Sequence, residues 1–386
     1  MFFLDLEFRG VLPGLFRFLI AFFVLQYLLC FPAVASEKVR IAAIFAKTGI
    51  AADHNRSLLK MTELAVQNVN QEGGVLGKEI ELLVLDNEST PIGSALAAQR
   101  AVDLNVLAVI GGHWSSHSLA MAPILQEAAI PMITPASTNP AITLERDYIF
   151  RVCFLDSFQG EAMAHFARED LAAQRAVVLR NIDEQYSLTL ARYFTKSFTE
   201  AGGEIVADIQ YRGDAIDFSN SIDEIQRLEP DVIYLPGYTQ DSGLLIKQAR
   251  KNGVTAVFLG GDAWDEIASL AGMSVDGSYQ TAPWHPMLAN EKSLMLQELY
   301  RHAFGTDIIN YSSPLAYDAV MVLVAAMKQC RCFAKEKIKA ALLAMESYDG
   351  ATGIIRFDEN GDQLNKDVLI LQFKENVPVF VKSVAP

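Results

Sequence analysis

Residues 39–86 read VRIAAIFAKTGIAADHNRSLLKMTELAVQNVNQEGGVLGKEIELLVLD and contain the unit on which the whole chain is patterned. The first seven residues form a short apolar run of the kind that is buried as a parallel strand, and residues 80–86 form a second. Between them, residues 58–70 carry apolar side chains at helical spacing along one stripe, and Gly73-Gly74 supplies a left-handed stop. This order predicts a βαβ unit.

The same alternation continues to the end of the chain and predicts two doubly wound α/β lobes with a ligand cleft between them. Further helices are expected at 91–104, 116–129, 158–172, 186–201, 217–228, 241–251, 291–304, 315–328 and 335–345. Further strands are expected at 106–111, 131–134, 150–152, 176–180, 204–209, 231–235, 256–259, 353–357, 368–373 and 377–381.

The net charge and the glycine and proline content exclude several classes of protein and one class of partner. The 386 residues carry a formal charge of −14, with 24 glycines and 14 prolines. Glycine and proline at these levels exclude collagen-like and disordered chains. An acidic surface repels phosphate backbones, so nucleic acid is not an expected partner.

The first residues predict export. Residues 18–31 form an apolar run after Arg17, and the small residues of 33–35 precede a suitable cleavage point. We therefore expect a cleaved signal peptide at residues 1–35 and a periplasmic protein. An uncleaved anchor is the alternative, although the run is shorter than the ~20 residues of a spanning helix.

Three cysteines follow that segment: Cys153, Cys330 and Cys332. An odd number leaves at least one thiol free or paired elsewhere. The spacing of Cys330 and Cys332 is expected to be too cramped for an unstrained bridge. No second ligand pair for zinc accompanies them, so idle thiols are the expectation.

Polar and aromatic residues follow the predicted strands, where open α/β sheets bind ligands. In the first lobe, Ser115 stands in the sequence GGHWSS (111–116) at the expected start of a helix. Free amides and a hydroxyl there suit a carboxylate, and the alternative is a plain helix cap. In the second lobe, Tyr186, Tyr238 and Asp262 follow strands. The acid suits a ligand cation and the rings suit an apolar body, and the alternative for Asp262 is helix capping.

Several short motifs occur together in a recognisable order. They are NxNxxGGVxG (68–77), DN (86–87), GGHWSS (111–116), ITPASTNPAIT (133–143), FR (150–151), QG (159–160), DFS (217–219) and GGD (260–262). Through them the chain resembles the type I periplasmic binding proteins, specifically the leucine/isoleucine/valine-binding branch that serves ABC transporters. The resemblance extends over residues 38–373.

The resemblance implies two α/β lobes joined by three crossovers that close on a ligand like a hinged clam. The first lobe would comprise 37–156 plus 286–356, and the second 157–285 plus 357–386. The ligand contacts that it implies are Ser115, Ala136 and Thr138 in the first lobe, Tyr186, Tyr238 and Asp262 in the second, and His54. The first three would hold the carboxylate and ammonium of an amino acid, and Asp262 would complete the ammonium site.

The chain departs from this branch at several positions. A first-lobe cysteine pair of the leucine-type members is matched by Ser89 and Trp114, so that bridge is not expected. His54 replaces an aromatic ring, and Asp262 replaces a commoner glutamate. These changes affect the part of the site that would hold the ligand side chain, so leucine should not be assumed to be the ligand.

The sequence therefore predicts a monomeric, cofactor-free solute-binding protein. It would capture a branched-chain-like amino acid, or a related small zwitterion or amide, by hinged closure and deliver it to an ABC transporter permease. A sensor that passes occupancy to a receptor is the alternative; the lack of an apolar span toward Pro386 favours transport. A metal on His113 and His117, or catalysis by Ser115 with one of these histidines as base, is disfavoured because no third ligand and no nucleophile motif is found.

Overall fold

The computed structural model of the protein describes residues 38–288 and 290–386; the expected signal peptide at 1–35 lies outside them. The first of its two large sheets has five parallel strands in the order β2-β1-β3-β4-β5. Their bounds are β1 Val39–Phe45, β2 Ile80–Asp86, β3 Ala108–Gly111, β4 Met132–Thr134 and β5 Ile149–Arg151.

Helices from both halves of the chain pack around this sheet and, with it, make up what we call the first lobe. Their bounds are α2 Ala52–Gln71, α3 Pro91–Asp103, α4 Ser115–Glu127, α10 Glu291–Phe304, α11 Pro314–Cys330 and α12 Lys335–Leu343. Helix α11 packs against α2 and α12, and α3 packs against α4. Because α11 is apolar on most sides, it is buried along nearly its whole length.

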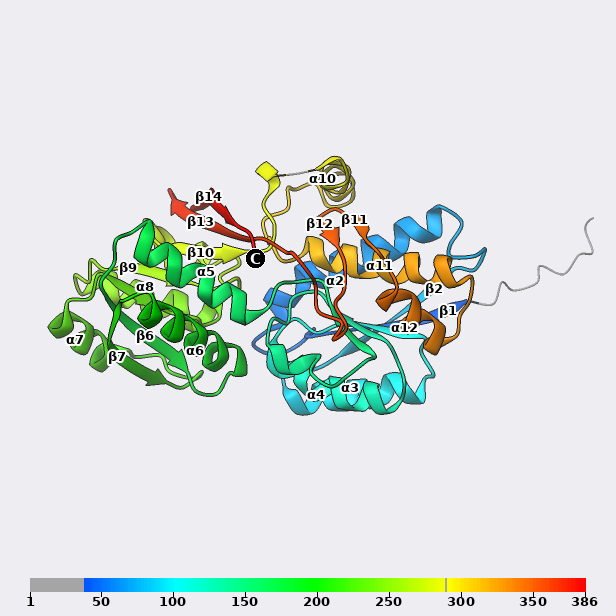
Figure 1. The fold of residues 1–386 in the computed structure, drawn as a ribbon, viewed down its shortest axis with the longest axis horizontal. Helices are drawn as coiled ribbons and strands as arrows, with labels where there is room; N and C mark the ends of the chain where they lie inside the picture. Colours follow the sequence, from blue (N-terminus) through cyan, green and yellow to red (C-terminus); the bar gives the residue numbers. More distant parts are fainter. Residues whose placement is uncertain (1–37, 289) are drawn as a thin grey trace, which may run out of the picture. The chain divides into compact units, whose positions relative to one another are not determined.

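The second sheet, in what we call the second lobe, has seven strands in the order β14-β13-β10-β9-β8-β6-β7. Strands β6 to β10 repeat the order of the first sheet, and β13 and β14 add an antiparallel edge beside β10 (Figure 1). The bounds are β6 Arg175–Asn181, β7 Glu204–Tyr211, β8 Val232–Tyr234, β9 Val257–Gly260, β10 Tyr279–Ala282, β13 Val368–Lys374 and β14 Val377–Val384. The helices of this lobe are α5 Asp156–Glu169, α6 Gln185–Glu200, α7 Ser219–Leu228, α8 Thr239–Lys251 and α9 Ala268–Ala271.

The chain passes between the lobes three times. It does so from β5 to α5, from β10 to α10, and from the small hairpin β11 (Tyr348–Gly350) and β12 (Gly353–Ile355) to β13. This arrangement confirms the predicted class of two α/β lobes joined by three crossovers. The lobe limits expected at residues 156, 285 and 356 stay a prediction.

Most predicted elements are found within a few residues of their expected bounds. Helix α2 begins six residues earlier than expected, and β10 was not expected at all. Strand β10 has the sequence YQTA, which carries too few apolar side chains to be recognised, yet Gln280 and Thr281 are buried. Parallel strands buried on both faces are usually apolar runs, so this strand departs from the pattern that the prediction relied on.

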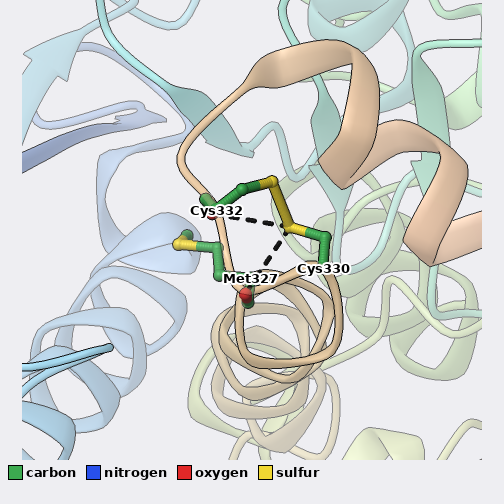
Figure 2. The surroundings of a disulfide bond; sticks show 3 residues. All are labelled: Met327, Cys330 and Cys332. Carbon is green, nitrogen blue, oxygen red and sulfur yellow. Dashed lines mark hydrogen bonds between the residues drawn. A yellow bond between two sulfur atoms is a disulfide. The ribbon is translucent and has the colours of Figure 1, made fainter.

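The prediction for two cysteines was wrong. Cys330 and Cys332 form a disulfide with their Cα atoms 5.3 Å apart, within the usual range (Figure 2). Helix α11 ends at Cys330, and Arg331 takes a left-handed conformation with φ 49° and ψ 42° that turns the chain back. This turn brings the two side chains together, which spacing alone did not suggest. Cys153 is free and buried, as one leftover thiol requires.

None of the helices in residues 38–288 and 290–386 has the length and apolar character needed to span a membrane.

Candidate functional site

The first-lobe side of the site is built at the end of β3. Gly111 has φ +146°, and a Cβ there would collide with the carbonyl oxygen of Ile44, so only glycine allows the strand to end in this way. Trp114 is in an extended conformation immediately before α4. Ser115 therefore begins the helix, where backbone amides are free to bind an anion, and its hydroxyl accepts a hydrogen bond from the Asn139 amide at 3.3 Å.

The loop after β4 is held from beneath by a buried arginine. Arg151, fully buried, donates to the carbonyl oxygens of Ser137 at 2.7 Å and Asn139 at 2.9 Å. Its Nε also pairs with Asp362 at 2.5 Å. Because both neighbouring carbonyls are taken, Thr138 is fixed between them, and its hydroxyl is buried next to the Asp156 carboxyl, where it opposes the rise that burial causes in the pKa of that group.

The second-lobe side is centred on Asp262, two residues after β9. One of its carboxylate oxygens accepts hydrogen bonds from the Tyr186 hydroxyl at 2.9 Å and from Gln159 Nε2 at 3.1 Å. The Asp262 amide in turn donates to Gln159 Oε1 at 2.9 Å. A Cβ at Gly261 would collide with the Tyr186 hydroxyl, so this close approach requires glycine.

The electrostatics of the site favour a cation. Burial raises the pKa of Asp262 to about 6, although the bonds from Tyr186 and Gln159 oppose the rise. Burial also raises the pKa of Asp156 to about 8, and the nearby charge of Asp262 adds to this rise. Among the residues that the structure describes, no basic side chain forms an ion pair with Asp262. A ligand ammonium would supply the missing charge.

The two sides enclose one cavity. Its walls are His113, Ser115, Ala136, Tyr186, Tyr238, Asp262 and Ala263. In this arrangement the cavity has room for about one water molecule.

Direct contacts join the lobes around this cavity. His54 Nε2 lies 2.9 Å from Gln240 Oε1, the Ser116 hydroxyl donates to Glu184 at 3.1 Å, and Asn139 Nδ2 donates to the Thr189 hydroxyl at 2.8 Å. The rings of Trp114 and Tyr238 stack with centroids 3.9 Å apart. The lobes are therefore in a closed arrangement.

Residues 38–378 match a family model whose description is "Periplasmic binding protein". The chain belongs to the periplasmic binding protein family. It is thus a substrate-binding protein and not an enzyme.

Individual relatives agree with this assignment. The chain is 28% identical over 348 residues to the leucine-, isoleucine-, valine-, threonine- and alanine-binding protein of Pseudomonas aeruginosa, covering 89% of this chain and 92% of that protein. It is similar to a leucine-binding protein of Thermotoga maritima, with 38% identity, a TM-score of 0.85, and coverage of 90% and 99%. It is also similar to a branched-chain amino acid transporter substrate-binding protein of Streptococcus pneumoniae in complex with isoleucine, with 26% identity, a TM-score of 0.86, and coverage of 91% and 100%.

In this periplasmic binding protein, five of the seven predicted contact residues line the common cavity: Ser115, Ala136, Tyr186, Tyr238 and Asp262. Thr138 lies beside Ala136 but is not among the wall residues. His54 also lies outside the wall and bonds across the lobes to Gln240 instead. The ligand-binding roles of all seven stay predictions.

Sequence reasoning missed some residues of the site. His113 and Ala263 line the cavity, and Gln159 holds the Asp262 carboxylate. His113 and Ala263 adjoin Trp114 and Asp262 in motifs that were recognised, so proximity in sequence was an available signal. Gln159 belongs to the QG motif (159–160), which was recognised, but its contact with Asp262 spans 103 positions of the chain and depends on the fold.

His113 and His117 each lie against the side-chain amide of an asparagine, Asn55 and Asn87 respectively. His117 Nδ1 lies 3.2 Å from the amide nitrogen of Asn87, and neither His113 nor His117 bonds to Ser115 among the described residues. Burial lowers the pKa of His113 to about 3 and that of His117 to about 4. Within the described part of the chain, no three His, Cys, Asp or Glu side chains are grouped for a metal ion.

Proposed function

We propose that this periplasmic binding protein captures a small α-amino acid or related zwitterion between its lobes and delivers it to the permease of an ABC transporter. One observation carries the proposal: a single closed cavity has a buried acid, Asp262, on one lobe and the start of a helix, Ser115, on the other. An acid and a helix N-terminus on opposite walls match the two charges of an amino acid.

Each end of the ligand has suitable partners. The carboxylate fits the Ser115 hydroxyl and the free amides at the start of α4. The ammonium fits the Asp262 carboxylate, the Ala136 carbonyl and the Thr138 hydroxyl. The Thr138 hydroxyl is buried beside the Asp156 carboxyl, and its oxygen can still accept a hydrogen bond from a ligand ammonium.

The lobes should close on the ligand because its hydrogen-bonding groups are divided between them. An open form offers the ligand only half of its hydrogen bonds and leaves one of its charges unmatched. Because only the closed form satisfies both ends, the ligand shifts the population toward closure. A permease that recognises the closed form would then receive only loaded protein.

The relatives support the ligand class and the setting. The Pseudomonas aeruginosa protein is named for binding leucine, isoleucine, valine, threonine and alanine, and the Streptococcus pneumoniae structure holds isoleucine. Delivery from the periplasm, with the protein acting as a monomer, completes the proposal.

Thermal unfolding of the purified protein tests the proposal. We expect at least one common L-amino acid at millimolar concentration to stabilise it, by about 2.7 kcal/mol once the ligand reaches 100 times its Kd. Short amides and simple carboxylates without an ammonium group are the matched comparison and should stabilise much less. Failure of every amino acid to raise the unfolding temperature would contradict the proposed function.

A further inference from the structure

A column of stacked rings closes one side of the cavity. Trp114 precedes α4 in the first lobe, and Tyr238 precedes α8 in the second. Their rings are nearly parallel, at 13°, with centroids 3.9 Å apart. His117 extends the column beyond Trp114, and Tyr186 extends it beyond Tyr238, each at 5.3 Å.

This column leaves no space between the lobes at that side. Trp114 is 4% exposed and Tyr238 is 6% exposed. A separation of 3.9 Å is direct van der Waals contact, so no ligand atom fits between the two rings. The indole nitrogen of Trp114 and the hydroxyl of Tyr238 are both buried without hydrogen-bond partners, which indicates that packing and not hydrogen bonding holds this contact.

The rings lie where a ligand side chain would extend. Once Asp262 and Ser115 are assigned to the two charged ends of an amino acid, the remaining walls are Tyr186, Tyr238, His113 and Ala263. Two of these four, Tyr186 and Tyr238, belong to the stacked column, so a side chain directed at them meets rings that are packed against one another. The far face of Tyr238 is covered by Trp114, so the ring cannot move back while the lobes are closed.

A second barrier lies beside the column. Gln240, two residues after Tyr238, accepts from His54 at 2.9 Å, and its amide nitrogen donates to the Ile50 carbonyl at 3.4 Å. Both contacts bind the second lobe to the first next to the stacked rings. A longer side chain would have to break them as well as separate Trp114 from Tyr238.

The cavity is small. In this closed arrangement it has room for about one water molecule. Even glycine therefore requires the lobes to part slightly, and each further side-chain atom requires them to part more.

We propose that the Trp114–Tyr238 stack restricts this protein to α-amino acids with short side chains, such as glycine, alanine and serine. The inference rests on the proposed function, because it takes the ligand to be an amino acid. It identifies Trp114 as a residue that determines specificity without contacting the charged ends of the ligand.

Calorimetric titration of the intact protein with glycine, L-alanine, L-serine, L-leucine and L-isoleucine tests the inference. We expect the best of the small three to bind at least about 100-fold more tightly than leucine or isoleucine. If leucine or isoleucine binds as tightly as the small amino acids, the size limit is wrong while the proposed function stands. If no amino acid binds, the proposed function fails and the size limit fails with it.

Variants then test whether the stack is the cause. Trp114→Ala and, from the other lobe, Tyr238→Ala should each raise the affinity for leucine relative to alanine by at least about tenfold. Trp114→Phe keeps a ring and should preserve the preference for small ligands, and Phe304→Ala on α10 controls for loss of an aromatic side chain elsewhere. Circular dichroism confirms folding. Unchanged relative affinities in a folded Trp114→Ala protein would overturn the role of the stack, and the wild-type ligand series decides the size limit even if a variant does not fold.

Discussion

Replacing Asp262 by asparagine should weaken amino-acid binding about 100-fold while making the ligand-free protein more stable. Asparagine keeps the shape of the side chain, and its oxygen can still accept from Tyr186 and Gln159. Its NH₂ group, however, presents donors to the ligand ammonium where aspartate presents a second oxygen. An ammonium buried without its counter-charge costs about 3 kcal/mol or more, which corresponds to about 100-fold in Kd.

The effect on stability has the opposite sign. Burial raises the pKa of Asp262 from 3.8 to about 6 in the ligand-free protein. Between these two pH values the folded state therefore binds more protons than the unfolded state. As pH rises through this range, the ionisation of Asp262 lowers the free energy of unfolding. At neutral pH this amounts to about 3 kcal/mol. The asparagine variant lacks this penalty, and its advantage over wild type should grow from about pH 4 to about pH 6 and then stay constant.

Calorimetric titration gives the change in affinity, and urea unfolding at a series of pH values gives the change in stability. Asp265→Asn is the matched control, since Asp265 is also a buried acid with its pKa raised to about 7 by burial, three residues further on, but does not line the cavity. It should alter stability and leave affinity within a few-fold of wild type. If Asp262→Asn retains wild-type affinity, Asp262 does not face the ligand ammonium.

Three further predictions follow from contacts around the cavity. Thr138→Val should weaken binding about tenfold, since the ligand ammonium loses the hydroxyl oxygen. The hydroxyl also interacts with Asp156 in the protein, so stability should fall as well, but by less than affinity; equal losses of affinity and stability, measured by titration and thermal unfolding, would point to a structural role. Affinity should fall below about pH 6, by up to about tenfold per pH unit, because Asp262 must lose its proton to pair with the ligand. Burial lowers the pKa of His54, so His54 stays neutral at and above pH 7 and should not affect ligand affinity there. A marked change in affinity, measured by calorimetric titration above pH 7, would contradict this. Arg151→Met should lower the free energy of unfolding by about 3–5 kcal/mol because Asp362 loses its buried partner; a change below about 1 kcal/mol in urea unfolding would refute this.

The fold was largely predictable because its elements follow simple rules. Strand β1 and helices α3 and α10 were predicted to within one residue because local features set their bounds. Strand β1 is an apolar run, α3 begins at a proline, and α10 ends before a glycine. Strand β10 was missed because it buries the polar side chains of Gln280 and Thr281. Thr281 donates to Gln159, a partner that only the fold supplies. The turn at Arg331 was missed because nothing in the local sequence requires a left-handed residue there.

The site was predictable only within each lobe. Ser115 and Asp262 were found because ligand sites lie after the strands of α/β sheets, a rule that needs no knowledge of the other lobe. The partner of His54 is Gln240, 186 positions away, and the partner of Trp114 is Tyr238. Such pairs depend on how one lobe meets the other, which no local pattern encodes.

The guanidinium of Arg151 grips two parts of the chain at once, the loop that carries Thr138 and, through Asp362, the third crossover. One buried side chain therefore holds both a connection between the lobes and a loop of the first-lobe side of the cavity. If the lobes move relative to one another, this loop should keep its conformation. Substitutions in the other two crossovers should consequently change the equilibrium between open and closed forms without changing the first-lobe contacts to the ligand. In an engineered sensor these two properties could then be adjusted separately.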